Sequence, residues 1–142
     1  MRRSLFAGIG IFVAVAVVAI AAATSLGGGR LGQLVAKDTD KGDSAVAVAG
    51  PVTIQNPGKM SMKITSKPRH RVGWNYTTDC LKDGKPFQYP PPGESQDTFD
   101  KTPIVKTLKT GGVKDADECT VVVSAKLKFK AAKRVTAKIY NK

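Results

Sequence analysis

Two segments determine the architecture of this chain: VGWNYTTDC at residues 72–80 and CTVVVSAKL at residues 119–127. Apolar and polar residues alternate in both, which is typical of half-buried β-strands. If the strands are antiparallel and Cys80 lies opposite Cys119, the opposed pairs are Thr78 with Val121, Tyr76 with Val123, Trp74 with Ala125 and Val72 with Leu127. A slip of one residue in either strand would turn the apolar side chains of that strand to the outer face of the sheet. The pattern therefore predicts this register and a Cys80–Cys119 disulfide.

The second of these segments is expected to form a strand over residues 120–129. Other short strands are expected at residues 51–55, 60–65, 104–108 and 135–140, separated by turns rich in Gly, Pro and Asn. Trp74 and Tyr76 are expected to fill the core beside the disulfide. Together these segments predict an all-β immunoglobulin- or fibronectin-like sandwich of six or seven antiparallel strands over residues 51–142. The Gly-rich and charged residues 24–50 are expected to form a flexible linker. Residues 45–49 could instead form an edge strand, because Val46 and Val48 alternate with alanines.

The chain opens on Arg2 and Arg3, followed by an uncharged, mostly apolar run at residues 5–23. Basic residues stay on the cytoplasmic side while the apolar run enters the membrane as a helix. Residues 1–23 are expected to be either a signal peptide, cleaved near the small residues 21–23, or a membrane anchor, because the run is just long enough to span a bilayer. Both alternatives place the remaining chain outside the cytoplasm, where two cysteines can pair.

The formal net charge of +12 favours anionic partners. The apolar residues of 135–139 match those of 123–127 in a hairpin around Ala131, and this hairpin would collect basic side chains on one outer face. That predicted face contains Arg69, Arg71, Lys126, Lys128, Lys130, Arg134 and Lys138. It is interpreted either as a site for an anionic polymer, a membrane surface or an acidic protein, or as a solvated face whose lysines prevent aggregation.

Catalytic and metal-binding patterns are not apparent. His70 is the only histidine, and no nucleophile or metal ligand stands at a useful spacing from it. The acidic residues at 115–118 could join Asp97 or Asp100 around calcium, but their spacing favours a solvated acidic turn. The expectation is a protein without cofactor or metal and not an enzyme. Sequence-specific nucleic-acid binding is also not expected, because only Tyr140 could bring a stacking ring to the basic face.

The combination of Arg2-Arg3, one apolar span, a Gly-rich tether and a small disulfide-bonded β-domain resembles exported proteins of high-GC Gram-positive bacteria. In outline it is similar to the mycobacterial small membrane proteins, which pair one anchor with a β-sandwich and accompany lipid-export transporters. The resemblance implies an accessory subunit of a membrane transporter. The cysteine contexts TDC at 78–80 and ECT at 118–120 depart from that family, so no site residue is carried over. A secreted protease inhibitor presenting residues 86–101 is a further alternative.

Overall fold

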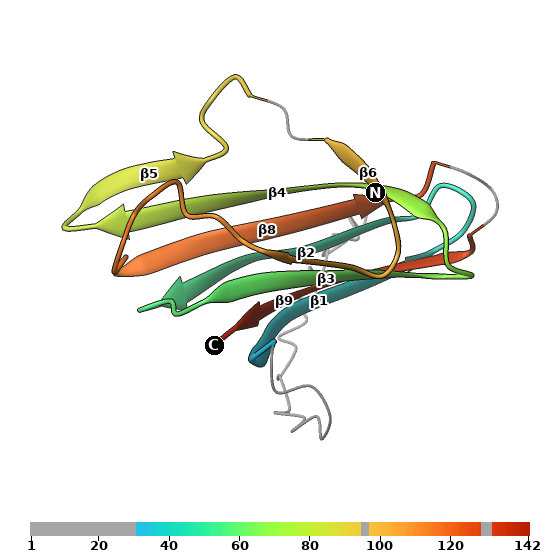
Figure 1. Cartoon of the computed structure of the whole chain (residues 1–142), viewed down its shortest axis with the longest axis horizontal. Helices are drawn as coiled ribbons and strands as arrows, with labels where there is room; N and C mark the ends of the chain where they lie inside the picture. Colours follow the sequence, from blue (N-terminus) through green and yellow to red (C-terminus); the bar gives the residue numbers. More distant parts are fainter. Residues whose placement is uncertain (1–30, 95–96, 129–131) are drawn as a thin grey trace, which may run out of the picture.

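The computed structural model describes residues 31–94, 97–128 and 132–142. In these residues the chain forms nine strands in two antiparallel sheets and no helix, which confirms the all-β prediction and raises the number of strands (Figure 1). We name the sheets after their central strands. The β9 sheet has the order β1 (Gln33–Lys41), β9 (Arg134–Asn141), β3 (Met60–Lys67) and β7 (Ile104–Thr107). The β8 sheet has the order β2 (Val46–Gln55), β8 (Glu118–Lys126), β4 (Arg71–Lys82) and β5 (Lys85–Tyr89), and β6 (Thr98–Lys101) also pairs with β4.

The expected signal peptide or anchor at residues 1–23 lies outside the described residues. Within the described ranges there is no helix long and apolar enough to cross a membrane.

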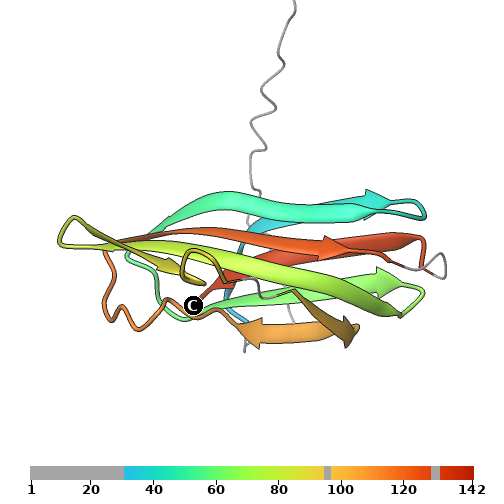
Figure 2. The ribbon, with the colours of Figure 1, turned by 90° about the horizontal axis from the view of Figure 1, so that it is seen from above.

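The strands of both sheets run along the long axis of the domain (Figure 2).

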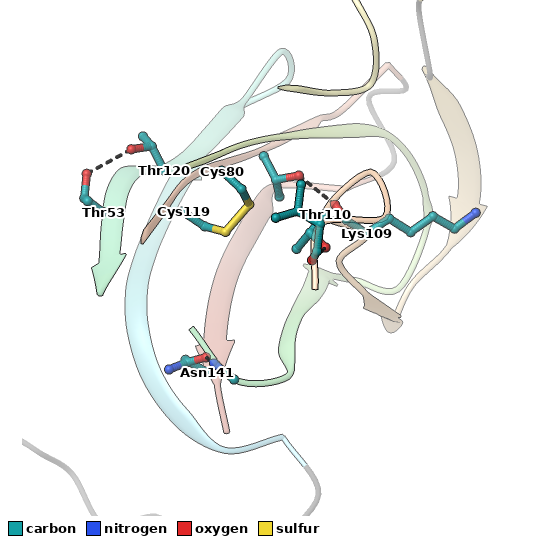
Figure 3. Close-up of a disulfide and its surroundings, with 10 residues drawn as sticks. Thr53, Cys80, Lys109, Thr110, Cys119, Thr120 and Asn141 are labelled. Carbon is teal, nitrogen blue, oxygen red and sulfur yellow. Dashed lines mark hydrogen bonds between the residues drawn. A yellow bond between two sulfur atoms is a disulfide. The ribbon is translucent and has the colours of Figure 1, made fainter. Parts of the chain in front are cut away.

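The predicted pairing of β4 with β8 is confirmed. Cys80 lies opposite Cys119, and Tyr76 lies opposite Val123. The two cysteines form a disulfide with an S–S distance of 2.05 Å and a Cα–Cα distance of 4.1 Å. Both are fully buried, and the bond points into the sandwich, whereas Thr53 and Thr120 form a hydrogen bond on the outer face (Figure 3). A sequence separation of 39 corresponds to about 4 kcal/mol in the chain-entropy description of disulfides.

The core lies between the two inner faces. From β8 it receives Val121, Val123 and Ala125, each with 0% exposure, and from β9 it receives Val135, Ala137 and Ile139, also with 0% exposure. The two predicted core aromatic residues belong to this layer. Tyr76 is buried and stacks on Trp74, and half-buried Trp74 donates its Nε1–H to Asp100 at 3.0 Å.

The predicted hairpin between the last two strands is wrong. β9 lies in the opposite sheet from β8, where it pairs with β1 on one side and β3 on the other. The apolar sets of β8 and β9 therefore face each other across the core instead of lying side by side. Alternation identifies the inward face of a strand but not its neighbours. Immunoglobulin domains keep their last two strands in one sheet, so the strand order here is different.

The predicted flexible linker at residues 24–50 is wrong at Gln33–Lys41, which form β1, whereas the alternative of an edge strand at 45–49 is confirmed by the first part of β2. The reason is that this part of the sandwich requires small side chains, which are also common in flexible linkers. Ala45, Ala47 and Ala49 have small side chains that resemble linker composition, yet they are 0–3% exposed. The charges at 37–41 alternate along β1, so that lysines and aspartates point to opposite sides of the strand.

The aspartates of β1 close the flank of the sandwich. β2 is an edge strand of the β8 sheet, and an edge strand presents unpaired backbone groups. Asp40 Oδ2 accepts a hydrogen bond from the Val46 N–H at 2.8 Å, and Asp38 Oδ2 accepts one from the Val48 N–H at 2.7 Å. We call this pair of contacts the carboxylate latch. Backbone N–H groups of Val46 and Lys41 lower the pKa of Asp40 because they stabilise its charged form.

Replacing Asp40 by Asn should lower the thermal midpoint at neutral pH, because a neutral amide accepts weaker hydrogen bonds than a carboxylate. A lowered folded-state pKa gives a contribution that is complete above the unfolded value of about 3.9 and is lost as the pH falls through the folded value. The difference between wild type and Asp40→Asn should therefore shrink on acidification below about pH 4 in scanning calorimetry.

Asp43→Asn is the matched control, since Asp43 pairs with Lys133 on the surface and both side chains are more than half exposed. This variant should change the midpoint little. Parallel midpoint-against-pH curves for wild type and Asp40→Asn would contradict the latch.

Candidate anion-binding site

The structure does not gather the predicted basic residues on one face. Arg71 and Lys126 belong to strands of the β8 sheet, whereas Arg134 and Lys138 belong to β9. Arg69 is exposed in the connection between β3 and β4, and Lys128 follows β8. Lys130 lies outside the described residues. The prediction of one shared face is wrong because it depended on the β8–β9 hairpin.

Two of the predicted cations near the β8 sheet, Lys128 and Arg71, are engaged with local groups. Lys128 Nζ lies 4.0 Å from the centre of the Phe99 ring, and Arg71 Nη2 donates to the Phe99 carbonyl oxygen at 3.3 Å. The same surface carries Asp97, which accepts a hydrogen bond from Asn75 at 2.7 Å. This side of the molecule is therefore a mixed surface of cationic, acidic and aromatic groups.

The outer face of the β9 sheet carries a different set of residues. Strand pairing places nine side chains in three rows across β1, β9 and β3, and we call this set the cationic array. The rows are Lys37–Lys138–Lys63, then Thr39–Thr136–Thr65, then Lys41–Arg134–Lys67. Two rows of cations thus enclose a row of threonines. Val135, Ala137 and Ile139, the residues of β9 between those of the array and next to them, are fully buried, which fixes the array on the outward side.

The strand geometry sets the spacing of the array. Directly opposed side chains have Cβ atoms about 4.5–5.5 Å apart. Successive rows are two residues apart, so the two cationic rows are separated by about 13 Å along the strands. An open hollow of about 520 Å³ lies over this face, and eight of the nine array residues line it, together with Ser66.

No acidic side chain compensates these charges at the outward positions of the described parts of β1, β3 and β9. Asp38 and Asp40 point instead to β2. The pKa of Lys138 is lowered, first by partial burial and then by repulsion from Lys37 and Lys63 on either side. Like charges directly opposite each other destabilise a sheet. The array therefore bears an unfavourable energy that a bound anion would relieve.

The sequence reasoning named only Arg134 and Lys138 of the array; it missed the three threonines and four of the cations, Lys37, Lys41, Lys63 and Lys67. Two fell in the expected linker, and the other two lie on a strand whose neighbours were not predicted. A signal was nevertheless present. The pattern cation-x-Thr-x-cation occurs three times in the sequence, as KDTDK at 37–41, KITSK at 63–67 and RVTAK at 134–138. These three copies are the three strand segments that the fold places side by side.

The fold does not bring the other candidate metal-binding or catalytic residues together. The Asp117 carboxylate accepts from the Asp83 N–H and Glu118 accepts from Gln55, so these acidic side chains have separate partners. His70 donates its backbone N–H to Ser66 Oγ at 3.0 Å. Among the residues with described positions, no three His, Cys, Asp or Glu side chains are grouped so that they could hold a metal ion. The stretch 86–101, considered above as the exposed segment of a protease inhibitor, contains most of β5 and all of β6.

Comparison of the chain with known protein families, with curated proteins and with solved structures finds no match. The candidate site is therefore defined by its geometry.

Replacing Lys138 by Gln should raise the thermal midpoint at low ionic strength, because it removes repulsion from the two lysines opposite it, on the order of 0.5 kcal/mol. The gain should fade in high salt, which screens exposed charges. A lowered lysine pKa also means that the wild type gains stability as the pH rises through that value toward about 10.4, and Lys138→Gln should show less of this gain.

Lys126→Gln is the matched control. Lys126 lies opposite Val46 and Gly73 instead of other cations. If both variants respond equally to salt and pH, the repulsion in the array is not a feature of the fold.

Proposed function

We propose that this chain is an exported, non-enzymatic binding protein of the cell envelope, and that its cationic array engages an anionic partner. The observation that carries the proposal is the alignment of three cation-x-Thr-x-cation segments in register on one outer face. Six cations in two rows form a positive surface that attracts polyanions.

The composition of the array supports binding in preference to catalysis. Its side chains are lysines, an arginine and threonines, which donate hydrogen bonds and carry positive charge. A hydrolytic or acid–base mechanism needs a group poised to exchange a proton near neutral pH, such as a histidine or a perturbed carboxyl group. Crowded cations with no acidic side chain beside them at the described outward positions of β1, β3 and β9 suit a ligand that brings its own negative charge.

The proposal of export rests on residues 1–23 and on the disulfide. A basic pair before a long apolar run is typical of a signal peptide or anchor. Disulfides persist mainly in oxidising spaces, and the Cys80–Cys119 bond is buried in the core between neighbouring strands. Both features agree with a domain that works outside the cytoplasm.

The binding proposal is tested with the full-length chain in a non-ionic detergent, titrated with inorganic polyphosphate and eluted from heparin. The triple substitution of Lys41, Lys67 and Arg134 by Gln removes three exposed array cations. Affinity should fall at least about tenfold, and the slope of log K against log salt should fall by about three, because each lost cation releases one fewer counterion.

The matched control replaces Lys101, Lys126 and Lys128 by Gln, which removes the same charge from the β8 side. This variant should keep most of its affinity. Equal losses in the two triples would mean that net charge, and not the array, governs binding.

Export is tested by fractionating native cells and sequencing the N-terminus of the protein. A chain beginning shortly after residue 23 shows a cleaved signal, and an intact Met1 in the membrane fraction shows an anchor. Recovery of the full chain from the cytosol with both cysteines reduced would refute the proposed location.

A further inference from the structure

On the basis of the proposed function, we propose that the ligand of the cationic array is a glycan or polyol with a phosphate monoester at each end, the two phosphates lying about 13 Å apart, one for each cationic row. The hydroxyl-bearing segment between the phosphates would lie on the threonine row. This inference names a class of ligand that positive charge alone does not specify.

The charge of each row suits a phosphate. Each row holds three cations side by side on β1, β9 and β3. A phosphate monoester carries about −1.5 to −2 at neutral pH and offers three acceptor oxygens. Three donors converging on one such group satisfy its oxygens, whereas a carboxylate offers one charge and two oxygens. Arg134 adds a planar fork that can engage two phosphate oxygens at once.

The threonine row indicates what joins the two phosphates. Thr39 Oγ1 and Thr136 Oγ1 lie 2.9 Å apart in a hydrogen bond. The two hydroxyls use one O–H between them, so one O–H and several lone pairs remain for a ligand. A segment that bears hydroxyls can use these groups, whereas an aliphatic segment would cover them without replacing the hydrogen bonds they make to water.

The shape of the face agrees with a short saccharide. The hollow over the array has a volume of about 520 Å³ and is open to solvent, so a saccharide could lie along it without entering a closed pocket. Two linked sugar rings with a phosphate at each end span about the separation of the cationic rows. A nucleic-acid strand would find few stacking partners, since single-stranded recognition uses several aromatic side chains, whereas the nine array residues include none and Tyr140 is the one ring at the next outward position of β9.

The experiment uses the full-length chain in non-ionic detergent and measures binding by calorimetry. The probes are a disaccharide with a phosphate at each end, the same disaccharide with one phosphate, and an alkanediol bisphosphate of equal length. The bisphosphorylated disaccharide should bind at least about tenfold more tightly than either other probe, because it alone engages both cationic rows and the threonine row. Equal binding of the three probes would overturn the proposal.

Thr136→Val tests the threonine row with a side chain of nearly the same shape. It should weaken binding of the bisphosphorylated disaccharide about fivefold or more and leave binding of the alkanediol bisphosphate unchanged, and Thr136→Ser should restore the affinity. An equal loss for both ligands would indicate a structural defect and would count against the proposal.

Inorganic polyphosphate separates this inference from the proposed function. If polyphosphate binds through the array while the disaccharide probes do not differ, the ligand class is wrong and the proposed function stands. If polyphosphate does not bind, the proposed function fails as well. Phosphatidylcholine vesicles containing phosphatidylinositol 4-phosphate form the lipid arm, and binding to these vesicles alone would overturn the glycan in favour of a membrane surface.

Discussion

The position of β9 between β1 and β3 is the constraint on which the rest of this structure depends. Val135, Ala137 and Ile139, alternate residues of β9, are fully buried in the core. The period of two along a strand then requires Arg134, Thr136 and Lys138 to point outward. Because β1 and β3 pair with β9 in matching register, their own cation-x-Thr-x-cation segments are brought beside it. Burial of aliphatic side chains thus builds a charged surface on the opposite face of the same strand.

The sequence supports one pairing and not the other for a physical reason. Two cysteines supply a fixed point between β4 and β8, and from that point the alternation gives every further pair. β9 has no such fixed point. Its alternation fits any neighbour with an apolar face. β8 was predicted as the neighbour because it is the nearest strand along the chain. The cationic site could not be predicted without knowing which strands pair with β9, although Arg134 and Lys138 were among the predicted basic residues.

The misassigned linker shows a second limit of composition. Alanines next to charged residues suggest a chain with little to bury, but the space between two closely packed sheets accepts only small side chains at some positions. Ala47 and Ala49 are 0% exposed for this reason. The nine-residue strand β1 is equally hard to recognise, because its polar residues serve two separate faces.

β1 combines those two tasks on alternate residues: cations for the array and carboxylates for the flank of β2. Inserting or deleting a single codon within β1 would invert this alternation beyond the altered point. Aspartates would then enter the positive surface, and lysines would face the amides of β2 that need acceptors. Point substitutions in β1 remove one group at a time. A register shift of one residue would place negative charges in the positive surface and would also remove the acceptors of the β2 amides. We therefore expect the length of β1 to be less tolerant of change than the identity of any one residue in it.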